Sequence, residues 1–289
     1  MLKMSAYKSI FFFLLFISVV SNISAQRVSL QIALGLMNYG GDLQGKGYTF
    51  AQSEFSFGAS LMYSINKFSV RAGFNAGKVQ GSDSANTGFA TRNLSFASSI
   101  VDGNLCLQYD IFSLEDKKFT PYIFAGIGVY HFNPYTTYNS QKVFLQPLGT
   151  EGQGLSIYPD RKPYSLTQFN VPLGIGVKYK VSDRIIIGFE YCSRLLLTDY
   201  LDDVSKTYPD ETELFKAHGQ TAVDVSFRGD ETDPSRTFPS GAIRGNPAHK
   251  DNYYTSSITL TYVFPEASSF SNGGGKRKSK NLNCPKRVL

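Results

Sequence analysis

Apolar and polar residues alternate along residues 55–65. One set of alternate positions is largely apolar, and the set between them is largely small or polar. The first set is Phe55, Phe57, Ala59, Leu61, Tyr63 and Ile65, and the second is Ser56, Gly58, Ser60, Met62 and Ser64. Because successive side chains of a strand point to opposite faces, this pattern predicts a β-strand that separates two different environments.

Seven further segments of strand length occur along the chain. The alternation is clear in most of them, but the segment 122–132 is apolar on both faces and its phase stays open. We therefore predict eight strands: Val28–Leu36, Phe55–Ile65, Phe68–Gly77, Leu94–Tyr109, Tyr122–Phe132, Gln168–Lys180, Arg184–Leu195 and Tyr254–Phe264.

The lengths of the connections indicate the type of sheet. Alternation alone would also fit a soluble barrel with an apolar, ligand-binding interior. At one end the connections are short, at 66–67, 181–183 and about a dozen residues around 115–118, whereas at the other end they cover 38–53, 78–93, 133–167 and 196–253. Short periplasmic turns opposite long extracellular loops are typical of outer-membrane proteins. The predicted fold is all-β, an eight-stranded antiparallel transmembrane β-barrel whose first strand begins, and whose last strand ends, on the periplasmic side.

The two ends of the chain differ in composition from the predicted barrel. Lys3 and Lys8 lie just before an apolar run, 10–20, which is followed by small and polar residues up to Ala25. This run of eleven residues is too short for a transmembrane helix, which needs about 20. We predict a signal peptide at 1–25, an outer-membrane barrel at 26–265 and a flexible basic tail at 266–289. The expected location is the cell outer membrane, after cleavage of the signal peptide.

The basic character of the chain belongs mainly to that tail. The formal net charge is +6, but six of the 29 Lys and Arg residues lie within the last 14 residues. The barrel region is close to neutral. A nucleic-acid-binding domain would gather its basic residues on a folded face, so we expect no nucleic-acid partner.

The predicted inward face carries several charged residues among glycines. Eight strands enclose a lumen just wide enough for side chains to fill. We expect the charged side chains to pair across this lumen, with glycines leaving room for the longer ones, and we expect no open pore. The charged residues are Arg71, Asp102, Lys178, Glu190 and Arg194, and the glycines are Gly73, Gly174, Gly176 and Gly188.

Candidate catalytic or ligand-binding patterns are weak. The three histidines are His131, His218 and His249, and no G-x-S-x-G pattern surrounds a serine. An acidic group follows the seventh predicted strand: Asp199, Asp202, Asp203, Asp210, Glu211 and Glu213. Its spacing misses the known calcium-loop pattern, so we expect solvated loop charge, with Ca²⁺ binding as the alternative. No enzyme activity and no cofactor are predicted.

Several loop stretches resemble a known family. They are Tyr39-Gly40-Gly41-Asp42-Leu43, 121–128 with 132–134, 146–154, Thr198-Asp199-Tyr200-Leu201-Asp202-Asp203-Val204-Ser205, and Arg244-Gly245-Asn246-Pro247. In these stretches the chain is similar to the PorG-like outer-membrane barrels of the Bacteroidota type IX secretion system. The run 199–204 is the most specific of them, because nothing in the physics of a barrel requires it.

The resemblance implies a non-enzymatic component of the protein secretion machinery. It further implies that the barrel, besides contacting outer-membrane lipid, contacts a periplasmic ring of PorK and PorN proteins. The longest periplasmic turn, with Glu115, Asp116, Lys117 and Lys118, is then the candidate partner surface. Two alternatives stay open: a structural or adhesive barrel that acts through its extracellular loops, and a barrel enzyme or ligand binder.

Overall fold

The computed structural model describes residues 26–44, 52–85 and 91–265. The predicted signal peptide, 1–25, and the predicted basic tail, 266–289, lie outside the described residues and stay predictions. Within the described ranges, no helix combines the length and the apolar character needed to span a membrane.

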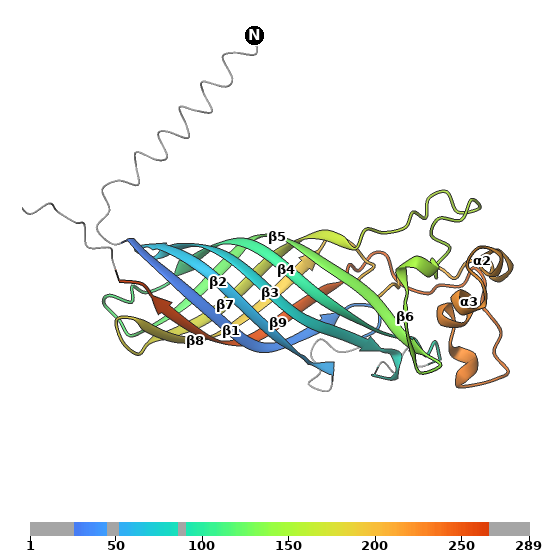
Figure 1. Ribbon diagram of the computed structural model, residues 1–289, viewed down its shortest axis with the longest axis horizontal. Helices are drawn as coiled ribbons and strands as arrows, with labels where there is room; N and C mark the ends of the chain where they lie inside the picture. The colour runs from blue at the N-terminus through green and yellow to red at the C-terminus, as the bar shows by residue number, and fades with distance from the viewer. Residues whose placement is uncertain (1–25, 45–51, 86–90, 266–289) are drawn as a thin grey trace, which may run out of the picture.

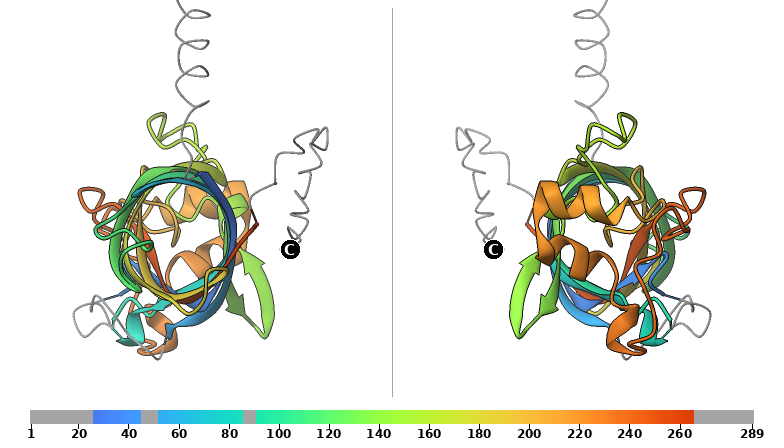
Figure 2. Two further views of the ribbon diagram at one scale, coloured as in Figure 1. Left: turned by 90° about the vertical axis from the view of Figure 1, so that its left-hand side faces the viewer. Right: turned by 90° about the vertical axis from the view of Figure 1, so that its right-hand side faces the viewer.

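The described strands form a closed antiparallel barrel (Figures 1 and 2). Every strand except β6 belongs to the barrel wall, and the ring closes because β1 pairs with β9 and β4 pairs with β5. The predicted eight-stranded barrel is confirmed. The strands are β1 (Gln26–Gly40), β2 (Glu54–Ile65), β3 (Phe68–Ser82), β4 (Ser95–Asp110), β5 (Phe119–Tyr138), β6 (Gln141–Phe144), β7 (Thr167–Lys180), β8 (Ile185–Leu196) and β9 (Asn252–Val263).

The alternation of exposed and buried side chains confirms the predicted phases. Leu61, Phe74 and Leu173 are exposed on the outside of the barrel, where lipid-facing residues belong. β5, whose phase the sequence left open, points a row of aromatic side chains into the lumen. That row is Tyr122, Phe124, Tyr130 and Phe132, each at most 4% exposed.

The strands extend farther at the loop end than the sequence predicted. β1 continues to Gly40, β3 to Ser82 and β5 to Tyr138. The clear alternation ends earlier than the strand pairing does, so the sequence pattern does not predict these extensions. Tyr39 and Val79 in these extensions are fully buried in the main apolar cluster, together with residues of the extracellular loops such as Leu201.

The short strand β6 was not predicted. It forms a hairpin with the end of β5, from Tyr135 paired with Phe144 to Tyr138 paired with Gln141. The two turn residues, Asn139 and Ser140, have positive φ angles of 49° and 62°. Two successive positive φ angles are typical of a type I′ turn, whose twist matches that of the flanking strands.

Charged side chains pair across the lumen, as predicted. Arg71 Nη1 lies 2.6 Å from Glu190 Oε2, and Arg194 Nε lies 3.4 Å from Asp102 Oδ1. The partner of Lys178 is Asp110, which the sequence analysis did not single out. Lys178 Nζ lies 2.9 Å from both of its carboxylate oxygens. Paired charges and the aromatic row of β5 thus fill the lumen together.

Glycines on β7 make room for two rings of that row. A Cβ atom on Gly174 would overlap the ring of Phe124, and one on Gly176 would overlap the ring of Tyr122. Neither position therefore has space for a side chain. The sequence analysis expected the inward glycines to leave room for the charged side chains, whereas at these two positions the room is taken by aromatic rings.

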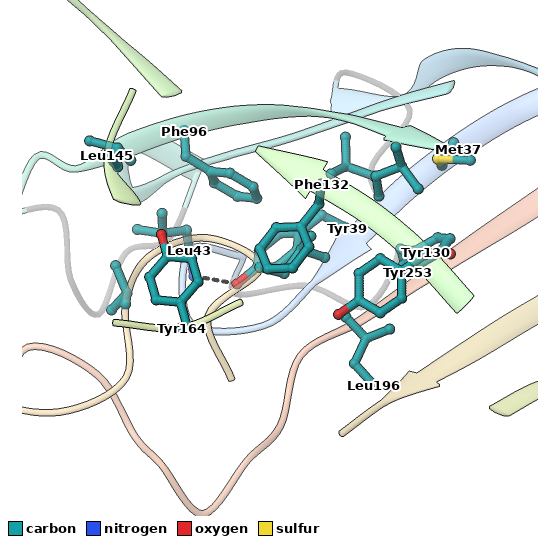
Figure 3. Packing of buried hydrophobic residues seen from close by; sticks show 14 of the residues in the cluster. Met37, Tyr39, Leu43, Phe96, Tyr130, Phe132, Leu145, Tyr164, Leu196 and Tyr253 are labelled. Carbon is teal, nitrogen blue, oxygen red and sulfur yellow. Dashed lines mark hydrogen bonds between the residues drawn. The ribbon is translucent and has the colours of Figure 1, made fainter. Parts of the chain in front are cut away.

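The largest buried apolar cluster lies at the loop end of the barrel, partly in the lumen and partly under the loops (Figure 3). Two helices, α2 (Glu211–His218) and α3 (Gln220–Ser226), lie at the same end (Figure 1). The sequence analysis missed both helices, although Asp210 caps α2 by accepting a 3.0 Å hydrogen bond from Glu213 N. Single 3₁₀ turns occur at Asp83–Ala85, Gln146–Leu148 and Gly229–Glu231.

Candidate functional site

Four of the stretches that carry the family resemblance, 39–43, 146–154, 198–205 and 244–247, meet at the loop end of the barrel, whereas 121–128 and 132–134 belong to strand β5. We call this region the loop cap; its residues are 41–44, 83–85, 91–94, 145–166 and 197–251. Tyr39, at the end of β1, points into it and donates a 2.6 Å hydrogen bond to Asp202 Oδ2. Asp251, just before β9, places Oδ1 3.1 Å from the same hydroxyl. Residues next to the first and last strands therefore share one contact.

This contact places one hydroxyl group between two carboxyl groups. The Tyr39 hydroxyl has one hydrogen, and its oxygen also accepts from Leu43 N at 3.4 Å (Figure 3). The hydroxyl hydrogen can be directed fully at only one of the two carboxyl groups, so a full hydrogen bond to the other needs a proton on that carboxyl group. Burial raises the pKa of both Asp202 and Asp251 well above the ordinary carboxyl value. That direction fits a protonated acid in this pair.

Arg244 joins two loops in the interior of the cap. It is 3% exposed, and its Nη1 donates a 3.1 Å hydrogen bond to Glu151 Oε1. Nη1 also donates to the carbonyl of Asp203, and Nε donates to Ser226 O at 3.3 Å. Glu151 accepts in addition from the backbone N–H of Ser205 at 2.8 Å. One buried ion pair thus fixes loop 145–166 against loop 197–251.

Asp203 adopts a left-handed backbone conformation beside this pair. Its φ of 66° is uncommon for a residue other than glycine. The carboxylate accepts from Tyr164 at 2.7 Å and from the hydroxyl of Thr150. Burial raises the pKa of Asp203 to about 6, although Arg244 opposes the rise. These side-chain contacts hold the turn in place.

A second arginine, Arg92, joins the residues that follow β3 to those that precede β4. Arg92 binds Asp83 in a bidentate manner, with distances of 2.8 and 2.7 Å. It also donates to Asp42 O at 3.0 Å and to the carbonyl of Arg244. Sequence reasoning missed Arg92, because it stands in no recognisable motif and its partner Asp83 lies nine residues earlier.

Two glycines allow chain segments of the cap to approach closely. A Cβ on Gly41 would overlap the carboxyl group of Asp251, and one on Gly245 would lie 2.6 Å from the backbone nitrogen of Ser205. Next to Gly245, the backbone N–H of Asn246 donates a 2.7 Å hydrogen bond to Asp42 Oδ2. Residues 41–42 and 245–246 therefore form one tight junction between the first and last loops.

The remaining resemblance residues have different surroundings. Leu201 is fully buried in the main apolar cluster, and Tyr200 stacks on Tyr164 with ring centroids 4.8 Å apart. Pro247 is exposed to solvent. Leu201, Tyr200 and Pro247 therefore all lie in the cap, and Pro247 is at its surface.

The expectation of solvated acidic charge is wrong for half of the group after β8. Asp199, Asp202 and Asp203 are at most 8% exposed. Asp202 accepts a hydrogen bond from Val204 N, and Asp203 accepts one from Tyr164, so both carboxyl groups organise a buried turn instead of facing water. Among the described residues, no group of three or more His, Cys, Asp or Glu side chains is placed to hold a metal ion.

The protonation of this acidic group varies with position. Burial raises the pKa of Asp199 to about 7, and the negative charges of Asp42 and Glu151 add to this rise while Ser205 opposes it. In contrast, Asp210 and Glu211 at the start of α2 are exposed, as expected. The cap therefore contains an acid that can change protonation near neutral pH.

The predicted partner surface lies at the opposite end of the barrel. Glu115, Asp116, Lys117 and Lys118 are exposed in the turn between β4 and β5. Glu115 forms a 3.0 Å ion pair with Arg27 on β1, and Lys117 Nζ lies 4.0 Å from the ring centre of Phe112. The site residues proposed from the sequence are thus divided between two ends, with the filled lumen between them.

The three histidines lie in different elements of the structure. His131 is on the outside of the barrel with Nδ1 3.1 Å from Thr167 Oγ1, and His249 Nδ1 lies 3.1 Å from Asn246 Nδ2. His218 ends α2. The three side chains come from three separate places in the structure.

Comparisons with solved structures find other barrels from outer membranes. OprG from Pseudomonas aeruginosa has 11% identity and a TM-score of 0.40, with coverage of 84% of this chain and 98% of that one. Ail of Yersinia pestis has 11% identity and a TM-score of 0.39, with coverage of 83% and 99%. The outer membrane enzyme PagL has 13% identity and a TM-score of 0.30, with coverage of 82% and 99%.

These similarities are low, and the barrel assignment rests on the strand pairing described above. Among curated proteins, none matches this chain. A family match covers residues 8–220, which include most of the barrel strands. The chain belongs to the family described as Domain of unknown function (DUF6089).

Proposed function

We propose that this protein is a non-enzymatic outer-membrane component of a type IX secretion machinery and that it binds the periplasmic ring of that machinery. The observation that supports this most strongly is the filled lumen. Arg71, Lys178 and Arg194 each face a carboxylate inside the barrel. Because the side chains of eight strands fill the space that the strands enclose, the working surfaces are the two ends.

The loop cap supports the family resemblance on which the proposal also rests. Stretches that are far apart in the sequence, at residues 39–43, 146–154, 199–205 and 244–247, form one connected unit.

The periplasmic turn 111–118 offers a suitable contact surface. Ile111 and Phe112 are 38% and 37% exposed, next to the charged residues 115–118. The turn is ordered by hydrogen bonds from Asp116 N and Lys117 N to Ser113 O. Exposed apolar side chains with polar groups around them are typical of protein–protein contacts. PorK- or PorN-type ring proteins are the proposed partners.

A pull-down from detergent-solubilised outer membranes tests the proposal. The variant Lys117→Glu/Lys118→Glu is compared with Lys162→Glu/Lys250→Glu, which reverses two exposed lysines in the loop cap. We expect the turn variant to lose the ring proteins about tenfold and the control to keep them, with both barrels folded on unheated gels. Equal recovery of ring proteins by the two variants would contradict the periplasmic contact.

A second candidate function is binding through the extracellular loops. A hollow of about 580 Å³ lies in the loop cap, and Tyr208, Phe227, Arg236 and Ile243 are among the residues that line it. Ile243 is 78% exposed. Binding of whole cells to surfaces or proteins should then fall with Ile243→Glu, while Lys117→Glu/Lys118→Glu leaves it unchanged. If only the turn variant has an effect, this candidate is excluded.

A further inference from the structure

We propose that the β5–β6 hairpin is a lateral anchor that binds the phosphorylated sugar headgroups of outer-leaflet lipid. The hairpin comprises residues 135–144. Viewed along the barrel axis it stands outside the ring of strands, drawn in light green (Figure 2). It is therefore placed beside the barrel at the extracellular end, over the membrane surface.

The inward face of the hairpin is bound to the loop cap. Arg228 donates a 3.1 Å hydrogen bond to Thr136 Oγ1, and Tyr138 donates a 2.7 Å hydrogen bond to Asp224 Oδ2. Val143, on the same face, packs against the main apolar cluster. These contacts fix the orientation of the hairpin.

The outward face continues the lipid-facing side of β5. Side chains two residues apart on a strand share a face, so Tyr135 follows the exposed Val129 and His131. The partner of Tyr135 across the hairpin is Phe144, and Thr137 is paired with Lys142. When a strand leaves the barrel wall outward, its lipid-facing side turns toward the membrane. The outward face of the hairpin consequently faces the lipid surface.

The position of this face along the barrel axis indicates which layer of the membrane it contacts. Exposed apolar residues of the barrel wall end here at Val129 on β5 and Val101 on β4, and Val101 is paired with His131. Tyr135 is four residues beyond His131, which is about 10 Å along the axis for a strand tilted by about 40°. This places Tyr135 and Phe144 above the hydrocarbon, in the headgroup region.

The chemistry of the face fits a phosphorylated sugar. Lys142 Nζ lies 3.8 Å from the ring centre of Tyr135 and 4.8 Å from that of Phe144. The two ring centres are 6.2 Å apart, and the ring planes meet at 69°. An exposed ammonium group held over aromatic rings offers a charge for phosphate and flat apolar surfaces for sugar rings.

A polar hollow adjoins the same face. It has a volume of about 370 Å³, and Lys78, Gln80, Ser95, Tyr135 and Thr137 are among its lining residues. These five side chains lie on the outward face of their strands, so the hollow opens toward lipid and not toward the lumen. Its hydroxyl and amide groups can donate hydrogen bonds to phosphate and sugar oxygens, while Lys78 pairs with Glu54 at 3.2 Å.

A tryptophan reporter tests the inference, because the chain contains no Trp. Phe144→Trp is placed in nanodiscs that contain either lipopolysaccharide or phosphatidylcholine alone, and Phe215→Trp on α2 is the matched control. Phe144 and Phe215 are 42% and 50% exposed, so neither substitution disturbs the core. We expect acrylamide quenching of the position-144 reporter to fall about twofold with lipopolysaccharide, and that of the position-215 control to stay unchanged.

Two further measurements identify the source of the effect. Adding Lys142→Glu to the reporter, or raising the salt concentration, should restore most of the quenching, since the contact with phosphate is electrostatic. Acyl-free core oligosaccharide should protect the position-144 reporter only weakly. Unlike the headgroups of a membrane, it is not held next to the hairpin by a lipid surface. Equal quenching of this reporter in both kinds of nanodisc would overturn the proposal, as would full protection by phosphatidylcholine alone.

Discussion

The lumen and the loop cap both bury charged side chains, but in different proportions. In the lumen, the three cations Arg71, Lys178 and Arg194 each face one carboxylate. In the cap, the buried cations Arg92 and Arg244 are accompanied by a larger number of buried acids. These acids are Asp83, Glu151, Asp199, Asp202, Asp203 and Asp251.

The difference shows two ways to accommodate a buried carboxylate. The lumen neutralises each acid with a cation, which must stay in place because an unpaired charge inside the membrane is very unfavourable. The cap uses backbone N–H donors, tyrosine hydroxyls and protons, as in the contact of Tyr39 with Asp202 and Asp251. We therefore expect the lumen to be insensitive to pH and the cap to respond to it.

The largest expected effect comes from breaking a lumen pair. Glu190→Gln leaves Arg71 charged without its partner, and the free energy of unfolding should fall by about 3–5 kcal/mol. Urea unfolding in micelles, followed by the mobility of unheated samples on gels, measures the loss. Glu54→Gln is the control, because Glu54 pairs with Lys78 near the surface, where such pairs contribute at most about 1 kcal/mol. Similar losses in both variants would show that the buried pair has no special role.

A smaller and more local effect is expected in the cap. Arg244→Met should lower the stability of the loop cap by about 2–3 kcal/mol at pH 8 and leave the barrel folded. At pH 5 the effect should be smaller, because Asp203 has a pKa of about 6 and needs no cation once it is protonated. Hydrogen exchange of the Ser205 and Lys206 amides, which bind Glu151, reports on the cap. The same effect at both pH values would argue against proton uptake.

The smallest expected effect concerns Asp199. Its pKa is raised from 3.8 to about 7 in the folded cap, so the folded state binds the proton more tightly than the open state. Stability from this group is therefore fully present below pH 3.8 and is lost as the pH rises through about 7. We expect a loss of about 1–2 kcal/mol, well below the full equivalent of the shift because solvent reaches part of the site.

Asp199→Asn should remove this dependence on pH and slow cap opening at pH 8. The measurement is the rate of limited proteolysis within residues 197–251 as a function of pH. Asp233→Asn, in a solvent-accessible turn, is the control and should keep the wild-type profile. If the wild-type cap opens at the same rate from pH 5 to pH 8, the protonation of Asp199 has no influence on it.

The sequence predicted the barrel well, because alternation has a direct physical cause. A residue such as Leu173 must face lipid, and its neighbours must then face inward. The alternation left the phase of β5 open, because the lumen there is filled by aromatic residues such as Tyr122 and Phe124. The glycines opposite them, Gly174 and Gly176 on β7, indicate that large side chains of β5 point inward. This pattern could have identified the inward face of β5.

The cap was predicted only as a set of motifs. Its contacts join residues with large sequence separations, such as Arg92 with Asp42 and Arg244 with Glu151. Burial of Asp202 could not be inferred from an acidic run, since most such runs are solvated. The sequence did contain a signal for the hairpin of β5 and β6. The Asn139-Ser140 dipeptide lies between residues of high β-propensity and is typical of a turn.

The contact of Tyr39 with Asp251 also constrains how the molecule is assembled. Tyr39 lies at the end of the first strand, and Asp251 lies immediately before the last one. These side chains can meet only after β1 and β9 have paired, because that seam brings Tyr39 opposite Tyr253. Completion of the outer loops is therefore a late event of insertion, and a barrel with an unclosed seam would display unfinished loops at the cell surface.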